Sequence, residues 1–138
     1  MNNPIELSLD ETAEVQAQLD AIAAVVGFTP TLGELLTEWA VFVARLEIGY
    51  DDSIYDYLDD LATRDLLQQI MDTASLTLRQ KLASALQSWD VRFTQATHTV
   101  DDTQAQIAWN GDSAWDRRVP NVLTGDLASD LRGAGLAL

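Results

Sequence analysis

The sequence predicts an all-α fold, a single-domain helical bundle of four main helices plus a short C-terminal helix. Apolar residues recur every three or four positions through most of the first hundred residues, as they do on the buried face of a helix. A serine or threonine precedes each such stretch, where a helix N-cap is expected. The chain has 138 residues and is 47% hydrophobic, which suits one domain, residues 1–138, with one core. Residues 1–8 and 133–138 are expected to fray.

The central helix of this bundle is predicted over residues 32–48. Thr31 and Glu34 fit a capping box at its start, and Gly49 stands where a left-handed residue would end it. The stretch is apolar on most sides, so it needs neighbours on more than one side. Its main apolar stripe consists of Leu32, Leu35, Leu36, Trp39, Phe42, Val43 and Leu46.

The other helices are predicted from the same signals. A first helix covers about residues 9–26, between a capping box that begins at Ser8 and Gly27. Ser53 is expected to cap a short helix over 54–61, and Thr63 to restart the chain as a further helical segment that ends near residue 74. Ser75 precedes the longest helix, about residues 76–97, whose Trp89 and Phe93 are expected to share one core with Trp39 and Phe42. The last, short helix follows residue 124.

Residues 98–121 have a different pattern and are predicted to form an irregular segment across the bundle. The sequence Trp-Asn-Gly-Asp at 109–112 is a strong turn signal. A short β-hairpin could form around it, with Ile107 and Trp109 on one strand and Trp115, Arg117 and Val119 on the other. The tryptophans would anchor the segment to the helices.

Charge is the unusual feature of the composition. The chain has 22 acidic and 8 basic residues, a net charge of −14, and residues 1–65 carry 14 of the acids and only two of the bases. Such a field repels nucleic acid and anionic membranes and favours a basic partner, although it also serves simple solubility. The chain has no cysteine. We see no signal peptide and no membrane-spanning stretch, so we expect a cytoplasmic protein.

Catalytic and metal-binding motifs are not found, and we expect a protein that is not an enzyme and has no cofactor. The sequence has no glycine-rich phosphate loop, dinucleotide-binding spacing or nucleophile elbow. The only histidine, His98, lies near Asp101 and Asp102 without a recognised catalytic spacing. Asp52, Asp56 and Asp60 follow each other at four-residue intervals, but the glycine turn of a calcium loop is missing, so we expect no metal site.

The preferred hypothesis is a non-enzymatic protein that binds a basic macromolecular partner and could neutralise it. Small acidic helical proteins of this kind resemble bacterial immunity and antitoxin proteins in size and charge. Carboxylates would steer the association and tyrosines would provide contact area. The expected contact residues lie between 50 and 60: Tyr50, Asp52, Tyr55, Asp56, Asp59 and Asp60. The last four are expected to point outward from the helix over 54–61.

The alternative hypothesis is a small-molecule-binding helical domain with a pocket near Trp109–Arg118. The pocket would lie between the tryptophan-bearing helices and the segment that contains Trp109 and Trp115, and Arg117 and Arg118 would hold an anionic ligand. In an acidic chain such an arginine pair is more often bound to the protein's own aspartates, and we favour that interpretation of the pair.

Overall fold

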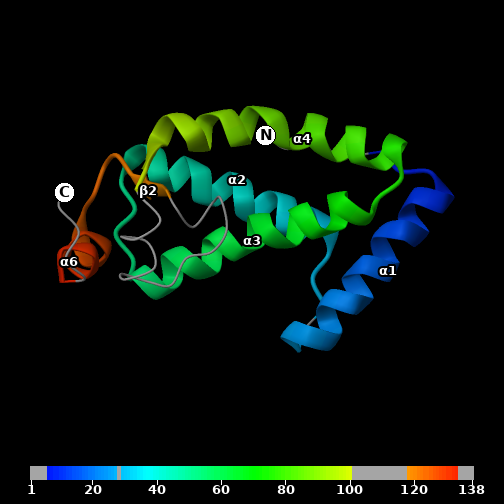
Figure 1. The fold of residues 1–138 in the computed structure, drawn as a ribbon, viewed down its shortest axis with the longest axis horizontal. Helices are drawn as coiled ribbons and strands as arrows, with labels where there is room; N and C mark the ends of the chain where they lie inside the picture. Colours follow the sequence, from blue (N-terminus) through cyan, green and yellow to red (C-terminus); the bar gives the residue numbers. More distant parts are fainter. Residues whose placement is uncertain (1–5, 28, 101–117, 134–138) are drawn as a thin grey trace.

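The computed structural model describes residues 6–27, 29–100 and 118–133 (Figure 1). In chain order the elements are α1 (Leu9–Val26), α2 (Leu32–Ile48), α3 (Ile54–Thr73), α4 (Leu76–Ala96), β1 (Thr97–Thr99), β2 (Arg118–Pro120) and α6 (Gly125–Gly133). The predicted all-α bundle of four main helices and a short C-terminal helix is confirmed. None of the described helices combines the length and the hydropathy that a membrane crossing requires.

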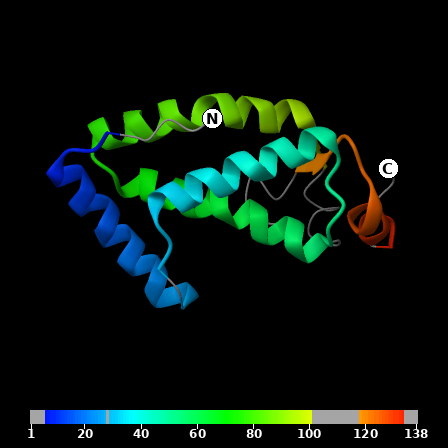
Figure 2. The same ribbon diagram turned by 180° about the vertical axis from the view of Figure 1, so that it is seen from behind.

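Three helices form the body of the bundle. α2, α3 and α4 lie side by side and each contacts the other two. α1 contacts α3 and diverges from the bundle at one end, whereas α6 packs on α3 at the opposite end (Figures 1 and 2). The neighbours predicted on more than one side of residues 32–48 are confirmed, because α2 contacts both α3 and α4, but α3 contacts four helices and is the more central element.

Local chemistry sets the helix ends. Ser8 and Glu11 form the reciprocal capping box of α1, and Thr31 accepts a hydrogen bond from the amide of Glu34 at the start of α2. Gly27 ends α1 with φ 83°, a left-handed conformation in which a β-carbon would be strained. Gly49 caps α2 through its N–H, which donates to the carbonyl of Arg45.

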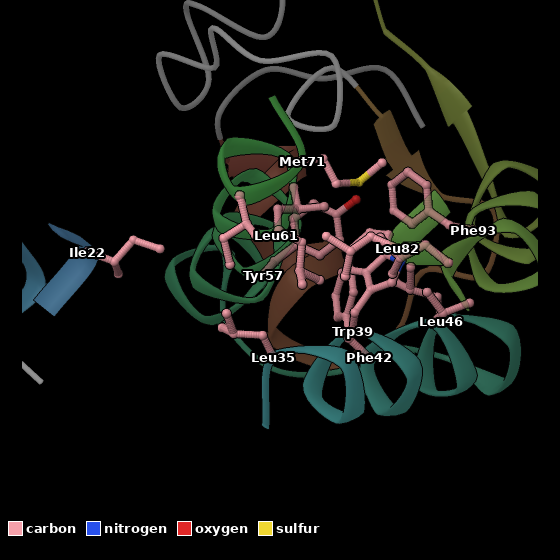
Figure 3. Close-up of a cluster of buried hydrophobic side chains, with 14 of the residues drawn as sticks. Ile22, Leu35, Trp39, Phe42, Leu46, Tyr57, Leu61, Met71, Leu82 and Phe93 are labelled. Atoms are coloured by element: carbon pink, nitrogen blue, oxygen red, sulfur yellow. The ribbon is translucent and has the colours of Figure 1, made fainter. Parts of the chain in front are cut away.

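Aromatic side chains fill the centre of the bundle (Figure 3). The rings of Trp39 and Phe93 lie 5.0 Å apart and those of Trp39 and Phe42 5.5 Å apart, all buried among α2, α3 and α4. Ile22 of α1 joins the same core at its edge. Trp89, expected in this core, is only partly buried, and the Arg92 guanidinium lies 4.3 Å from its ring centre. Its predicted position inside the core is therefore confirmed only in part.

The predicted helix boundary before Thr63 is wrong. α3 is one continuous helix of 20 residues, without an interruption before Thr63. Thr63 lies inside it and its hydroxyl donates to Glu38 of α2 at 3.4 Å, so a contact between helices replaces the predicted cap. Before α1, Leu7 packs against the core and Lys81 Nζ donates to the Glu6 carbonyl at 2.8 Å.

The chain end is joined to the bundle by a short antiparallel pair. β1 and β2 pair with His98 opposite Val119. In the predicted hairpin, Val119 was instead placed on a strand that pairs with the segment containing Ile107 and Trp109. The hairpin turn at 109–112 lies outside the described residues. α6 then docks on the beginning of α3: Asp126 N–H donates to the Asp51 carbonyl at 3.0 Å, and Asp130 accepts from the amide of Ile54 at 2.9 Å.

Candidate functional site

The acidic face consists of Asp51, Asp52, Tyr55, Asp56 and Asp59, which belong to the loop before α3 and to its first two turns. Tyr55 is 76% exposed, and Asp56 and Asp59 are exposed beside it. The predicted outward direction of these three side chains is confirmed. A large, exposed aromatic ring among carboxylates is a feature that packing of the bundle does not require.

The buried side of α3 determines which of its residues form the acidic face. Tyr57 and Leu61 are fully buried, so positions 55, 56 and 59, which lie on the other side of the helix, point away from the core. Ser53 caps the helix by accepting from the amide of Asp56 at 3.2 Å, and its hydroxyl donates to the Asp56 carboxylate at 3.0 Å. The negative charge at residue 56 therefore also stabilises the N-terminus of α3.

Tyr50 does not belong to the exposed surface, and its prediction as a contact residue is wrong. Its side chain is fully buried, with its ring 5.5 Å from those of Phe42 and Tyr57. The hydroxyl donates to Asp60 Oδ2 at 2.6 Å. Burial is the main reason why the pKa of Tyr50 is raised. The residues that follow Tyr50 are polar, so the local pattern did not indicate that its ring belongs to the buried aromatic core.

Asp52 is partly neutralised. Its carboxylate lies 2.8 Å from Arg45 Nη2, which also approaches Asp51 at 3.6 Å. The hydrogen bond to Asp52 is the main reason why the pKa of Arg45 is raised. The guanidinium also lies 4.6 Å from the ring centre of Tyr50. Asp52 therefore stays at the surface as predicted, but it also holds the loop to α2.

Asp60 was predicted to point outward and is instead partly buried between α2 and α3. Burial is the main cause that raises the pKa of its carboxyl, against the opposing effect of the Tyr50 hydrogen bond. No described basic side chain forms an ion pair with it. Asp60 is therefore not part of the exposed acidic face.

A pocket of about 200 Å³ opens between α2 and α3 beside Asp60. We call it the α2–α3 pocket. Its lining combines an apolar wall, two carboxylates, a hydroxyl and a guanidinium. The residues are Thr37, Glu38, Val41, Phe42, Arg45 and Asp60.

A buried polar network on the other side of α3 was not predicted. Arg64 is only 4% exposed and makes two hydrogen bonds to the Asp90 carboxylate, at 3.1 and 2.9 Å. Trp39 Nε1 donates to the same carboxylate at 2.9 Å, and Arg64 also donates to Gln68 at 3.1 Å. The network joins α2, α3 and α4. Arg64 lies three residues after the inward-facing Leu61, a spacing that is the sequence signal for its burial.

A groove between α3 and α4 has a volume of about 690 Å³, and Arg64 and Asp90 contribute to its lining. These two charges bind each other, and they link the helices structurally. The groove therefore has no charged group in the described residues that clearly points to a particular ligand.

The residues of the alternative small-molecule site fall mainly outside the described part of the chain, namely Trp109, Trp115 and Arg117. Arg118 is described, and the hydrogen bonds that it makes to described residues go to Thr97 Oγ1 at 2.7 Å and to the carbonyls of Thr94 and Thr97. We expected Arg118 to bind aspartates of the protein itself, but none of these described partners is an aspartate. It instead joins β2 to the end of α4.

His98 is exposed, and its Nδ1 lies 2.8 Å from Asn121 Oδ1. Asp101 and Asp102 lie outside the described residues. Within residues 6–27, 29–100 and 118–133, no three histidine or carboxylate side chains are grouped in a way that would hold a metal ion.

Comparison with protein-family models, curated proteins and solved structures gave no match.

Proposed function

We propose that this protein is a non-enzymatic binding protein that recognises a basic protein partner through its acidic face, in the cytoplasm. The observation that carries the proposal is Tyr55, 76% exposed and flanked by the exposed carboxylates of Asp56 and Asp59. Tyrosine provides a large contact area with few rotatable bonds, and it is enriched among residues that dominate binding energy.

The carboxylates of the acidic face would act mainly on association. Asp59 has no hydrogen bond or ion pair with a described residue, and the chain carries a net charge of −14 that is concentrated in its first half. Such a field raises the rate of encounter with a basic protein and excludes nucleic acid. Replacing Asp56 and Asp59 by asparagine is therefore expected to slow association and reduce its salt dependence.

Tyr55 would act on dissociation. Its ring makes contact area that exists only in the complex, so Tyr55→Ala should speed dissociation and weaken binding by about 1–2 kcal/mol. The fold should be unaffected, because the ring is exposed in the free protein.

Affinity capture from the native cell lysate tests the proposal. The three baits are wild type, the double variant Asp56→Asn/Asp59→Asn, and the control Asp20→Asn/Asp72→Asn. The control makes the same change of net charge at exposed positions on α1 and at the far end of α3. We expect a basic protein that wild type and control retain and that the acidic-face variant loses. Retention of the same proteins by all three baits would contradict the proposal and favour the small-molecule alternative.

A further inference from the structure

The α2–α3 pocket adjoins the acidic face. Asp60 in the pocket follows Asp59 of the face along α3, and Arg45 at the pocket wall is bound to Asp52 of the face. The pocket and the acidic face are therefore neighbours, linked through the Arg45–Asp52 ion pair.

The pocket has the dimensions of one side chain. Its volume of about 200 Å³ corresponds to about six or seven water molecules at roughly 30 Å³ each. Val41, which is 54% exposed, and the buried Phe42 provide apolar surface in its lining. An aliphatic stem of four carbons, such as that of lysine, would cover that surface and carry its charged end toward the carboxylates.

The charges of the pocket are unbalanced. Neither Glu38 nor Asp60 forms an ion pair with a described basic residue; Glu38 accepts only a long hydrogen bond, 3.4 Å, from Thr63 within the described part. The Arg45 guanidinium is instead engaged with Asp52 at 2.8 Å. Burial raises the pKa of Asp60, although the Tyr50 hydrogen bond and the Arg45 charge both act to lower it, so a further cation would stabilise the carboxylate.

We infer that the α2–α3 pocket receives one lysine or arginine side chain of the basic partner, with Glu38 and Asp60 holding the cationic group and Val41 and Phe42 contacting the stem. This inference rests on the proposed function and adds a specific anchor to it. Two carboxylates beside an apolar wall suit an organic cation better than Ca²⁺ or Mg²⁺, which each need about six or more oxygen ligands. A free aliphatic amine shares this chemistry, and the experiment separates the two sources.

The test measures binding of a fluorescein-labelled lysine decamer by anisotropy at low and physiological salt. The variants are Glu38→Gln and Asp60→Asn, which keep side-chain size, and the control is Asp20→Asn on the exposed surface of α1. Each pocket variant should weaken binding about tenfold, the worth of a charge-assisted hydrogen bond, and the control less than about twofold. Amide signals from the NMR spectrum of each variant check that its fold is unchanged.

A second arm uses n-butylamine, with n-butanol as a neutral analogue of the same length. We expect the amine alone to shift the amide signals of residues 37–42 and 60–63, with a far weaker affinity than the decamer. Amine binding as tight as decamer binding would assign the pocket to a free small ligand and overturn the inference.

The outcomes for the pocket and for the acidic face are distinct. If the decamer binds wild type and both pocket variants match Asp20→Asn, the pocket inference is wrong and the acidic-face proposal stands. If the decamer does not bind wild type at physiological salt, both are wrong. If the pocket variants alone lose binding, both are supported.

Discussion

Removal of the Asp90 carboxylate is the perturbation whose cost the structure specifies best. This group neutralises Arg64, whose side chain is 5% exposed, through two hydrogen bonds, and it accepts a third from the Trp39 indole. Loss of one partner of a buried ion pair costs about 3–5 kcal/mol. Asp90 is 24% exposed, so water can replace part of the interaction and the lower figure applies. The lost indole bond adds about 1 kcal/mol.

Asp90→Ala should therefore lower the free energy of unfolding by about 4 kcal/mol, a large part of the stability of an ordinary domain. Urea unfolding at pH 7, followed by circular dichroism at 222 nm, measures it, with Asp20→Ala as an exposed control that should change stability by less than about 0.5 kcal/mol. Arg64→Met in the Asp90→Ala background should recover about 2 kcal/mol, because it removes the buried charge. A loss below about 1 kcal/mol for Asp90→Ala, or simple additivity in the double variant, would refute this reasoning.

Three other changes test the core, an ion pair and a turn. Trp39→Ala empties the centre of the aromatic cluster and should cost about 3–5 kcal/mol in the same urea assay; a cost below 1 kcal/mol would show that the core is assigned incorrectly. The hydrogen bond from Lys81 is the main reason why the pKa of the Glu11 carboxyl is lowered from 4.5. The Glu11 carboxylate therefore stabilises the folded state above pH 4.5, and this stabilisation is lost as the pH falls through the lowered pKa. Glu11→Gln should therefore flatten the fall of the unfolding midpoint between about pH 5 and pH 3, and an unchanged profile would contradict the assignment. Gly125 has φ 56°, and a β-carbon there would lie 2.8 Å from the Asp51 carbonyl oxygen. Gly125→Ala should therefore lower the free energy of unfolding by at least about 1–2 kcal/mol. An unchanged midpoint of thermal unfolding would contradict the observed docking of α6.

The helices could be predicted from the sequence because their signals are local. Ser8, Thr31, Ser53 and Ser75 each accept a hydrogen bond from an amide three residues later, and this geometry depends only on the adjacent chain. The repeat of apolar residues identified the inward faces in the same way. Thr63 is the exception, because its residue type suggested a cap while a contact with another helix keeps it inside α3.

The candidate site could be predicted only in part. Tyr55 and Asp59 were placed correctly because the inward stripe of their own helix determines where they point. The burial of Tyr50 depends on Phe42 and on Asp60, ten residues later, so local periodicity gave no indication of it. The α2–α3 pocket was missed for the same reason, since its two carboxylates come from different helices and their proximity is a consequence of packing.

The central claim, that a basic chain binds at the acidic face, is tested most directly by locating where it binds. A lysine decamer with one nitroxide spin label broadens the NMR signals of amides near it. If the claim is right, broadening is confined to residues 51–60 of the acidic face and 37–42 of the adjoining α2, while the amides of α1, which also carries exposed acids, stay sharp. Equal broadening along α1 and α3 would contradict the claim, because it would show that the decamer follows the net charge of the protein and has no preferred surface.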